Sequence, residues 1–188
     1  MSSKKVVLKP TISNICSKAK VSCLLDLNHI YQCNKYLNFI NKRYNKKRFV
    51  GLIVKLKSTN ATILMFKSGS LILMGVKDIN SLFLTCDHIK QELLYIGYSN
   101  PSISTLKITN ICGSMNLNRR IDLERIAACF PISSSYEMEI FPGLKITRNN
   151  IKWTVHWNGK IFSTGFKSMN HINKEFKKMQ NFLLDFQK

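Results

Sequence analysis

Two closely similar stretches, Ile12-Ser-Asn-Ile-Cys16 and Ile108-Thr-Asn-Ile-Cys112, open the two halves of this 188-residue chain. At the same spacing from them, Leu25-Asp-Leu27 returns as Ile121-Asp-Leu123. The order is then kept by two further pairs, Ser68-Gly-Ser-Leu71 with Asn158-Gly-Lys-Ile161 and Gly75-Val-Lys77 with Gly165-Phe-Lys167. Matches in a fixed order indicate two tandem copies of one unit. We therefore predict repeats over residues 9–100 and 101–188, after a short basic tail over residues 1–8.

Each copy is expected to contain strands and helices in the same order, which gives an α+β class. A first strand (9–17 and 105–113) leads to a helix capped near Asp26 or Asp122, because aspartate is a favoured N-cap residue. In the first copy this helix is expected to extend toward the polar run 41–47. Strands follow over 49–57, 61–67 and 70–75, with a hairpin turn at Ser68-Gly69.

A closing helix with an apolar stripe is expected in each copy. Residues at helical spacing form these stripes, and such residues are normally core. The first stripe is Ile79, Leu82, Phe83, Cys86, Ile89 and Leu93, and the second is Ile172, Phe176, Met179, Leu183 and Phe186.

The predicted strands are apolar on both faces. Ile63, Met65, Leu71 and Leu73 share one parity, whereas Leu64, Phe66, Ile72 and Met74 share the other. Two helices per repeat can cover only one face of a sheet. The other face is therefore either an oligomer interface or a binding surface for a partner with apolar parts, such as the sugar edges of a DNA minor groove.

Composition narrows the class of partner. Lys and Arg number 29 against 10 Asp and Glu, which gives a net charge of +19 and a pI near 9.9. This excess is typical of proteins that bind phosphates, although a codon bias toward lysine would raise it too. With 45% hydrophobic residues the chain is expected to fold.

Enzyme and metal chemistry find no support in the sequence. The six cysteines form no CxxC pair and the four histidines do not join them at zinc-ligand spacing, so we expect free thiols, no metal and no cofactor. No nucleophile triad, phosphate loop or carboxylate cluster stands out, so an enzyme is not expected. No signal peptide or membrane-length apolar run is present, which predicts an intracellular, soluble protein.

Several segments of the chain carry a family resemblance. Ser134-Ser-Tyr-Glu-Met-Glu-Ile-Phe-Pro-Gly-Leu144 is similar to the "SSYEPELFPGL" stirrup of TATA-binding proteins, and Lys107-Ile-Thr-Asn-Ile-Cys-Gly-Ser114 to the start of their second repeat. Pro10-Thr-Ile-Ser-Asn-Ile15, Asn45-Lys-Lys-Arg-Phe49 and Lys160-Ile-Phe-Ser-Thr-Gly-Phe-Lys167 match as well, from about residue 9 to the end, with a short insertion near 36–42. The resemblance implies a saddle-shaped fold: ten curved antiparallel strands with four helices on the convex face.

The resemblance also implies roles for individual residues. Asn14 and Asn110 would donate to minor-groove acceptors near the pseudo-dyad. Phe49 and Phe66 would form one wedge between base steps, and Phe141 would begin the other, with Val50 and Pro142 beside them. The floor of the groove site would be Cys16, Leu64, Ile72 and Met74 in the first repeat and Cys112, Thr154, Phe162 and Thr164 in the second. Arg48, Lys55, Lys77, Lys160 and Lys167 are phosphate-contact candidates, each with a solvated charge as its alternative.

The implied function is transcription initiation: binding an A·T-rich promoter element, bending it and recruiting RNA polymerase in the nucleus. Glu137, Glu139 and Ile140 would bind transcription factor IIB, although two solvated acids are the simpler interpretation. Transcription factor IIA is a further candidate partner, and self-dimerisation of the unbound protein another. The alternative function is an architectural or viral relative that bends DNA without nucleating transcription.

Two departures from the family pattern stand out. His156 stands where the spacing back from Asn158-Gly159 places the fourth wedge phenylalanine, so we expect a shallower or pH-sensitive kink, with Phe162 compensating. The closing helix of the first repeat is nearly neutral over residues 85–92, where the family is basic. Factor IIA and repressor docking there would be lost or remodelled.

Overall fold

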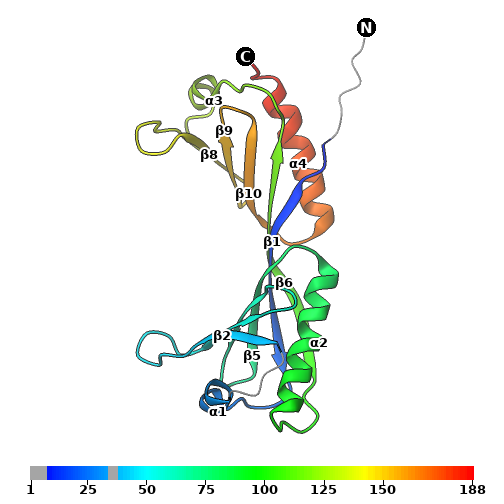
Figure 1. The fold of residues 1–188 in the computed structure, drawn as a ribbon. Helices are drawn as coiled ribbons and strands as arrows, with labels where there is room; N and C mark the ends of the chain where they lie inside the picture. Colours follow the sequence, from blue (N-terminus) through cyan, green and yellow to red (C-terminus); the bar gives the residue numbers. More distant parts are fainter. Residues whose placement is uncertain (1–7, 34–37) are drawn as a thin grey trace. The chain divides into compact units, whose positions relative to one another are not determined.

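The computed structural model describes residues 8–33 and 38–188, drawn as a ribbon in Figure 1. Contacts divide the chain into two compact units. We call Asn14–Thr109 the N-terminal unit, and the residues up to Ser13 together with Asn110–Lys188 the C-terminal unit. The predicted repeat boundary near residue 100 follows sequence similarity rather than contacts, and it stays a prediction.

The N-terminal unit contains five strands in the order β2-β3-β4-β5-β1. The chain runs β1 (Thr11–Val21), α1 (Leu27–Gln32), β2 (Phe39–Arg43), β3 (Leu52–Leu56), β4 (Thr62–Met65), β5 (Ser70–Val76) and α2 (Ile79–Tyr95). The pairs between β5 and β1, β2 and β3, β3 and β4, and β4 and β5 are antiparallel.

The C-terminal unit repeats this plan with the strand order β6-β10-β9-β8-β7, in which β6 belongs to this unit from Asn110 onward. The chain runs β6 (Ile103–Asn116), α3 (Leu123–Cys129), β7 (Ser134–Ser135), β8 (Gly143–Arg148), β9 (Ile151–His156), β10 (Lys160–Phe166) and α4 (Met169–Leu184). Its strand pairs are antiparallel as well. The expected α+β class, with ten strands and four helices in the described residues, is confirmed.

The predicted helix starts are confirmed, but the extension of the first helix is wrong. Asp26 and Asp122 are the N-caps of α1 and α3, and their carboxylates accept backbone N–H groups of the first turn. α1 ends at Gln32 with Cys33 as C-cap. The polar run that was assigned to the helix instead contributes to β2, which begins at Phe39, and that buried ring lies opposite Leu56 in the sheet.

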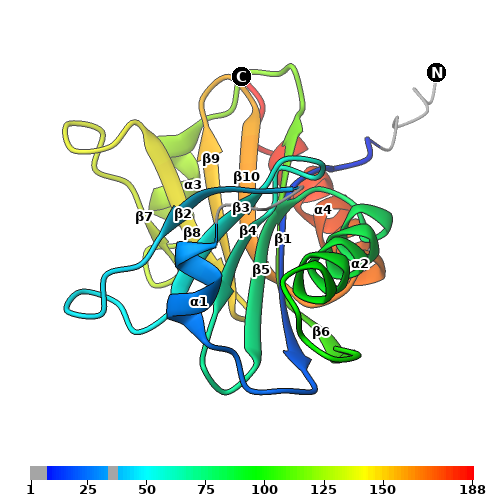
Figure 2. The same ribbon diagram turned by 60° about the horizontal axis from the view of Figure 1, so that its bottom comes forward.

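The core of each unit lies between its long helix and one face of its strands. α4 packs against β10 (Figure 1), and α2 packs against β5 (Figure 2). The predicted α4 stripe is confirmed, because all five of its residues are buried. The α2 stripe is wrong at Phe83, which is 55% exposed, and at Ile79, which is also exposed. The buried side of α2 is formed instead by Leu82, Thr85, Ile89, Glu92 and Leu93.

Both hairpins that precede the long helices close in the same way. Gly69 and Gly159 have φ angles of +81°, which glycine adopts without a Cβ penalty. Each donates its N–H to the residue three positions earlier, Phe66 or His156, at 2.9 Å. The predicted turn at Ser68-Gly69 is therefore confirmed. Among the described helices, none combines the length and apolar character that a bilayer crossing requires.

Candidate nucleic-acid interface

The N-terminal unit presents a second sheet face, opposite the one that packs on α2. Leu52, Ile63 and Leu73 on the packed face are fully buried, whereas the alternate residues remain partly exposed. In register, Leu64 lies between Ile53 and Ile72, and Met74 lies opposite Thr62. Five predicted floor or flank residues therefore share this face: Cys16, Lys55, Leu64, Ile72 and Met74. We call it the open face of the unit.

The C-terminal unit has an open face of the same construction. Phe162 lies opposite both Thr154 and Ser114, and Thr164 lies opposite Cys112. A broad hollow of about 560 Å³ is lined by Cys112, Thr154, Phe162 and Thr164, together with Lys145 and Lys152. Phe162 is 48% exposed, which is unusual for a large aromatic side chain on a sheet. The four predicted floor residues of the second repeat are thus brought together.

A pair of aromatic rings stands beside each open face. In the N-terminal unit the Phe49 and Phe66 rings are 5.7 Å apart in an edge-to-face arrangement. In the C-terminal unit Phe141 and His156 are 6.0 Å apart with a similar tilt. We call these the Phe–Phe pair and the Phe–His pair. A partly exposed aromatic pair offers flat, apolar edges to a ligand.

The loops that carry these pairs have the same backbone. Phe49 N–H donates to the Asn45 carbonyl at 2.9 Å, and Phe141 N–H donates to the Glu137 carbonyl at 2.8 Å. Both rings then approach a glycine two residues later, Gly51 or Gly143, where a Cβ would meet the ring within 2.7 Å. Together with the matching Gly69 and Gly159 turns, this places His156 at the structural position of Phe66.

Asn14 and Asn110 are held in one amide orientation by the backbone. Asn14 Oδ1 accepts the Gly75 N–H at 2.7 Å, and Asn110 Oδ1 accepts the Gly165 N–H at 2.9 Å. Both glycines have positive φ, +96° and +116°, and sit where strand register is irregular. With the oxygen used, each amide presents its NH₂ group. The Asn14 group donates to Cys16 Sγ, and the Asn110 group donates to Cys112 Sγ and to the Thr164 hydroxyl. An amide fixed in this way is a donor to acceptors such as purine N3 and pyrimidine O2.

Several cations lie on or beside the open faces. Among those predicted, Lys55 is half-buried, while Arg48, Lys77, Lys160 and Lys167 are exposed. Sequence reasoning missed Lys18, which lies opposite Ile72, and Lys145 and Lys152, which lie opposite Thr154 and Thr164. Their alternation with these residues in the strands was the signal that could have found them.

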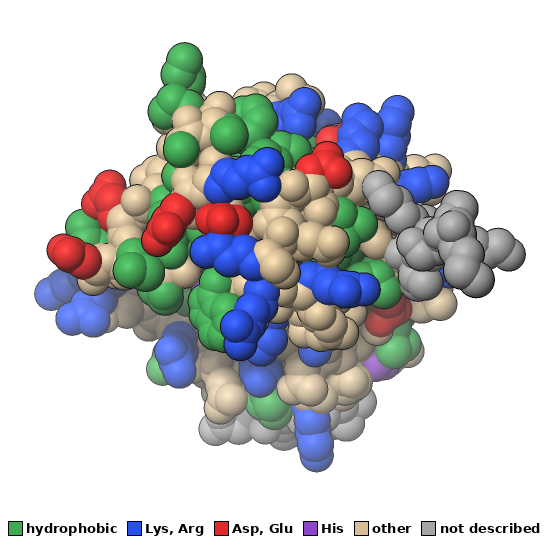
Figure 3. Space-filling model, turned by 90° about the horizontal axis from the view of Figure 1, so that it is seen from above, with side chains coloured by type: hydrophobic (Ala, Val, Ile, Leu, Met, Phe, Trp, Pro, Cys, Tyr) green, Lys and Arg blue, Asp and Glu red, His purple; other side chains and the backbone are tan. Residues whose placement is uncertain are grey.

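Glu137, Glu139 and Ile140 lie on the outer side of the loop that carries Phe141. All three are exposed, with Ile140 at 80%, and Met138 between them is exposed too. Within the described residues, neither carboxylate has an ion-pair partner. In the view of Figure 3 several acidic side chains lie toward the left, next to hydrophobic side chains and among Lys and Arg.

The described residues contain no cluster that could bind a metal ion and no disulfide. Over residues 8–33 and 38–188, no group of three or more His, Cys, Asp or Glu side chains could hold an ion. The described cysteines are free thiols. Burial raises the pKa of Cys86 to about 11, which disfavours its reactive thiolate.

Comparison of the sequence with known protein families shows the family of this chain. A family model described as "Transcription factor TFIID (or TATA-binding protein, TBP)" matches residues 9–95 and 105–186. The chain belongs to the TATA-binding protein family. It is 33% identical over 181 residues to the TATA-box-binding protein of Emericella nidulans, covering 95% of this chain and 65% of that protein. It is 32% identical to that of Schizosaccharomyces pombe, covering 95% of this chain and 76% of that protein.

A solved archaeal member of the family has the same fold. The Methanococcus jannaschii TBP superposes with a TM-score of 0.80 at 24% identity, covering 95% of this chain and 99% of that one. The predicted fold class is therefore confirmed. The roles of the aromatic pairs, the oriented amides and the open faces toward DNA remain predictions.

Proposed function

We propose that this protein binds A·T-rich promoter DNA in the minor groove and bends it to initiate transcription. Its two repeats, residues 9–100 and 101–188, would each contribute one open face and one aromatic pair. The proposal rests on three features that occur together in each unit. They are an asparagine amide held in one orientation, a row of apolar side chains on the open face, which we call the apolar strip, and a partly exposed aromatic pair beside it. The names of the relatives, TATA-box-binding proteins, support it.

In the proposed mechanism each of these features contacts a different part of the DNA. Lysines beside the open faces neutralise phosphates and release counterions, which makes binding salt-dependent. The asparagine NH₂ groups and the apolar strip face the groove floor, where A·T pairs present only acceptors. The aromatic pairs enter base steps, and TATA-binding proteins are the standard example of such wedges, with unstacking costing about a few kcal/mol per step. Flexible TA steps are the easiest to deform, so shape contributes to the choice of sequence.

The acidic loop would serve a second partner. Glu137, Glu139 and Ile140 are exposed beside the DNA-binding loop, where carboxylates repel phosphate. We propose that they bind a factor IIB-like protein, with factor IIA as a further partner and the nucleus as the site of action. Catalysis forms no part of the proposal. Self-association through the open faces would be the state of the unbound protein.

Binding and bending can be measured together by energy transfer between dyes at the two ends of a short TATA-containing duplex. We expect tight binding with a large bend, lost in Phe49→Ala and Phe66→Ala and weak on a G·C-rich duplex. Phe83→Ala is the matched control, because Phe83 is an exposed phenylalanine on α2. Salt-sensitive binding to every sequence without bending would contradict the proposal and leave a non-specific nucleic-acid-binding protein.

The architectural alternative is separated by charge reversal. Glu137→Lys with Glu139→Lys should preserve bending yet abolish recruitment of a factor IIB-like protein to the promoter complex. Asp87→Lys, a reversal at an exposed α2 position, is the control. A native protein that bends the duplex but recruits no such factor would favour the architectural alternative. Recruitment that survives the double reversal would show that this loop is not the recruiting surface.

A further inference from the structure

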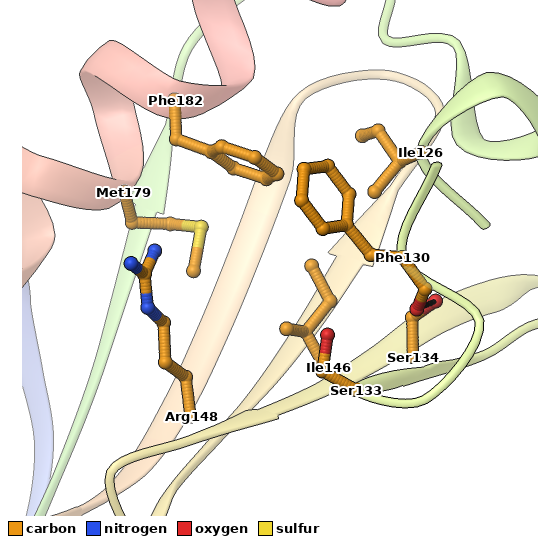
Figure 4. A pocket seen from close by; sticks show the side chains of 8 residues that line it. All are labelled: Ile126, Phe130, Ser133, Ser134, Ile146, Arg148, Met179 and Phe182. Carbon is orange, nitrogen blue, oxygen red and sulfur yellow. Dashed lines mark hydrogen bonds between the residues drawn. The ribbon is translucent and has the colours of Figure 1, made fainter. Parts of the chain in front are cut away.

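An apolar pocket lies in the C-terminal unit, between α3, α4 and the β7–β8 edge (Figure 4). It encloses about 240 Å³ and is lined by Ile126, Phe130, Ser133, Ser134, Ile146, Arg148, Met179 and Phe182. Ile146 and Met179 are buried, so the pocket is on the packed side of the sheet. It is therefore separate from the open face and its DNA-facing residues.

The pocket exists because β7 is short. In the N-terminal unit β2 continues to Phe39, whose buried ring lies opposite Leu56. In the C-terminal unit β7 holds only Ser134 and Ser135, opposite Ile146 and Lys145. The Ser133 carbonyl still accepts the Thr147 N–H of β8 at 2.9 Å, but the Ser134 N–H bonds back to the Phe130 carbonyl at 3.1 Å. The two serines of β7 thus offer no counterpart of the buried Phe39 ring of β2.

The mouth of the pocket carries a cation that no acid neutralises. Arg148 is exposed at the end of β8, and Figure 4 shows its guanidinium beside Met179. Within the described part of the chain Arg148 has no ion-pair partner. The nearby acid on α4, Glu175, is already paired with Lys178 at 2.6 Å. The exposed side chain of Ile132, at 101%, extends the apolar character along the loop that leads to β7.

We propose that this pocket binds a partner protein through a large apolar side chain flanked by a carboxylate. The apolar walls would take the anchor residue, and Arg148 would bind the neighbouring acid, since guanidinium matches carboxylate geometry. A second copy of this chain fits poorly, because its net charge of +19 would bring further cations to Arg148. The pocket faces away from the open face, so a partner can bind while DNA is held.

The binding preference of the pocket can be tested by adding short capped peptides to the full chain. The protein is isotopically labelled at its Ile and Met methyl groups, so that NMR reports binding. The probes are acetyl-Asp-Phe-Asp-amide, its Asn-Phe-Asn and Lys-Phe-Lys forms, and acetyl-Asp-Ala-Asp-amide. We expect the first to shift the methyl signals of Ile126, Ile146 and Met179. The Asn form should bind on the order of three- to fivefold more weakly, as expected for one exposed charge contact. The Lys and Ala forms should not bind.

Two variants and one control separate a real site from chance binding. Arg148→Gln keeps the fold, because the side chain is exposed, and should reduce the Asp-Phe-Asp peptide to the affinity of the Asn form. Ser134→Leu fills the pocket and should abolish binding, with the methyl spectrum reporting its fold. Arg119→Gln, at another exposed arginine of the same unit, should change nothing. Equal binding of the Asp and Lys peptides, or shifts confined to Ile72 and Met74 on the open face, would overturn the proposal.

Discussion

The Phe–Phe pair and the Phe–His pair stand on nearly identical backbones but present different chemistry. In both loops the N–H of the phenylalanine donates to the carbonyl four residues earlier, and both hairpins turn on a glycine at φ +81°. The second ring nevertheless changes from Phe66 to His156. A repeated backbone therefore fixes where a side chain stands but not how it acts on a base step.

The change at His156 is accompanied by a shift of bulk to the neighbouring strand. In the N-terminal unit Leu64 lies opposite Ile72, whereas in the C-terminal unit Thr154 lies opposite Phe162. The Phe162 ring packs edge-to-face on His156 at 5.8 Å. Apolar volume has thus moved from β9 to β10, which supports a compensating role for Phe162. The open face of the C-terminal unit is more polar near its edge as a result.

The two loops also differ in charge. The N-terminal loop carries Lys46, Lys47 and Arg48 between its closing residues, whereas the C-terminal loop carries Met138, Glu139 and Ile140. Cations beside an aromatic wedge favour phosphate, while acids beside one are repelled by it. The difference in charge agrees with the proposal that the first loop binds DNA alone and that the second also binds a protein.

The largest expected effect separates the two pairs directly. Base–aromatic stacking is worth about 1–3 kcal/mol per base, so Phe66→Ala should weaken binding to a TATA duplex on the order of 100-fold. His156→Ala should cost on the order of tenfold, because imidazole fills less space and Phe162 remains. Titrations of the end-labelled duplex measure both affinity and bend. Equal losses in the two variants would mean that the pairs are equivalent wedges.

A smaller effect is expected when the first ring of each pair is displaced. A Cβ at Gly51 would stand 2.7 Å from Phe49 Cε1, and a Cβ at Gly143 would stand 2.6 Å from Phe141 Cε1. Each Gly→Ala change should push its ring aside and weaken DNA binding by on the order of tenfold, with the bend reduced at that end. Dyes placed to report each kink separately measure this. An unchanged bend would show that the first ring of the pair does not enter the base step.

Much of the fold could be predicted because the same sequence signals occur at equivalent positions of both copies. Asp26 and Asp122 stand at the same point of both copies, and strand parity separates Leu64 and Ile72 from the buried Ile63. The second strand of each unit could not be found. β2 contains the polar run Asn41-Lys42-Arg43, and β7 has two residues, so neither offers an apolar period to detect.

The candidate site was predicted in part for a related reason. Residues named through family segments lie together, but Lys18, Lys145 and Lys152 become neighbours only through cross-strand register. Phe83 was misassigned because it directly follows Leu82, and adjacent helix positions point about 100° apart. The pocket beside Arg148 depends on where β7 stops, and periodicity does not specify that point.

On the packed side, the units differ in how their short helix ends. Lys42 Nζ donates to the Tyr31 carbonyl at 2.6 Å and to the Ile30 and Cys33 carbonyls, at the C-terminus of α1. In the C-terminal unit the Ser134 hydroxyl makes the corresponding bond to Phe130. Lys42→Met should lower the free energy of unfolding by about 1 kcal/mol, because helix C-terminal carbonyls lose their donor.

Urea denaturation measures this stability difference. Ser134→Ala removes a single donor at an exposed end and should cost less, about 0.5 kcal/mol. Lys57→Met, at an exposed lysine after β3, is the control and should be neutral. If Ser134→Ala proves the more damaging of the two, the lysine is a solvated charge rather than a cap.

The smallest and sharpest test restores symmetry to the pairs. His156→Phe makes the second pair match the first, and we expect about threefold tighter binding with a larger bend at that end, because phenyl stacks without a polar edge. The gain is small because Phe162 already contacts this position at 5.8 Å. Bend angles of the native protein and of His156→Phe on the same end-labelled duplex measure this. Identical angles in the two proteins would show that histidine serves as well as phenylalanine there. Any difference between the two ends of the bend would then have to come from the loop charges instead.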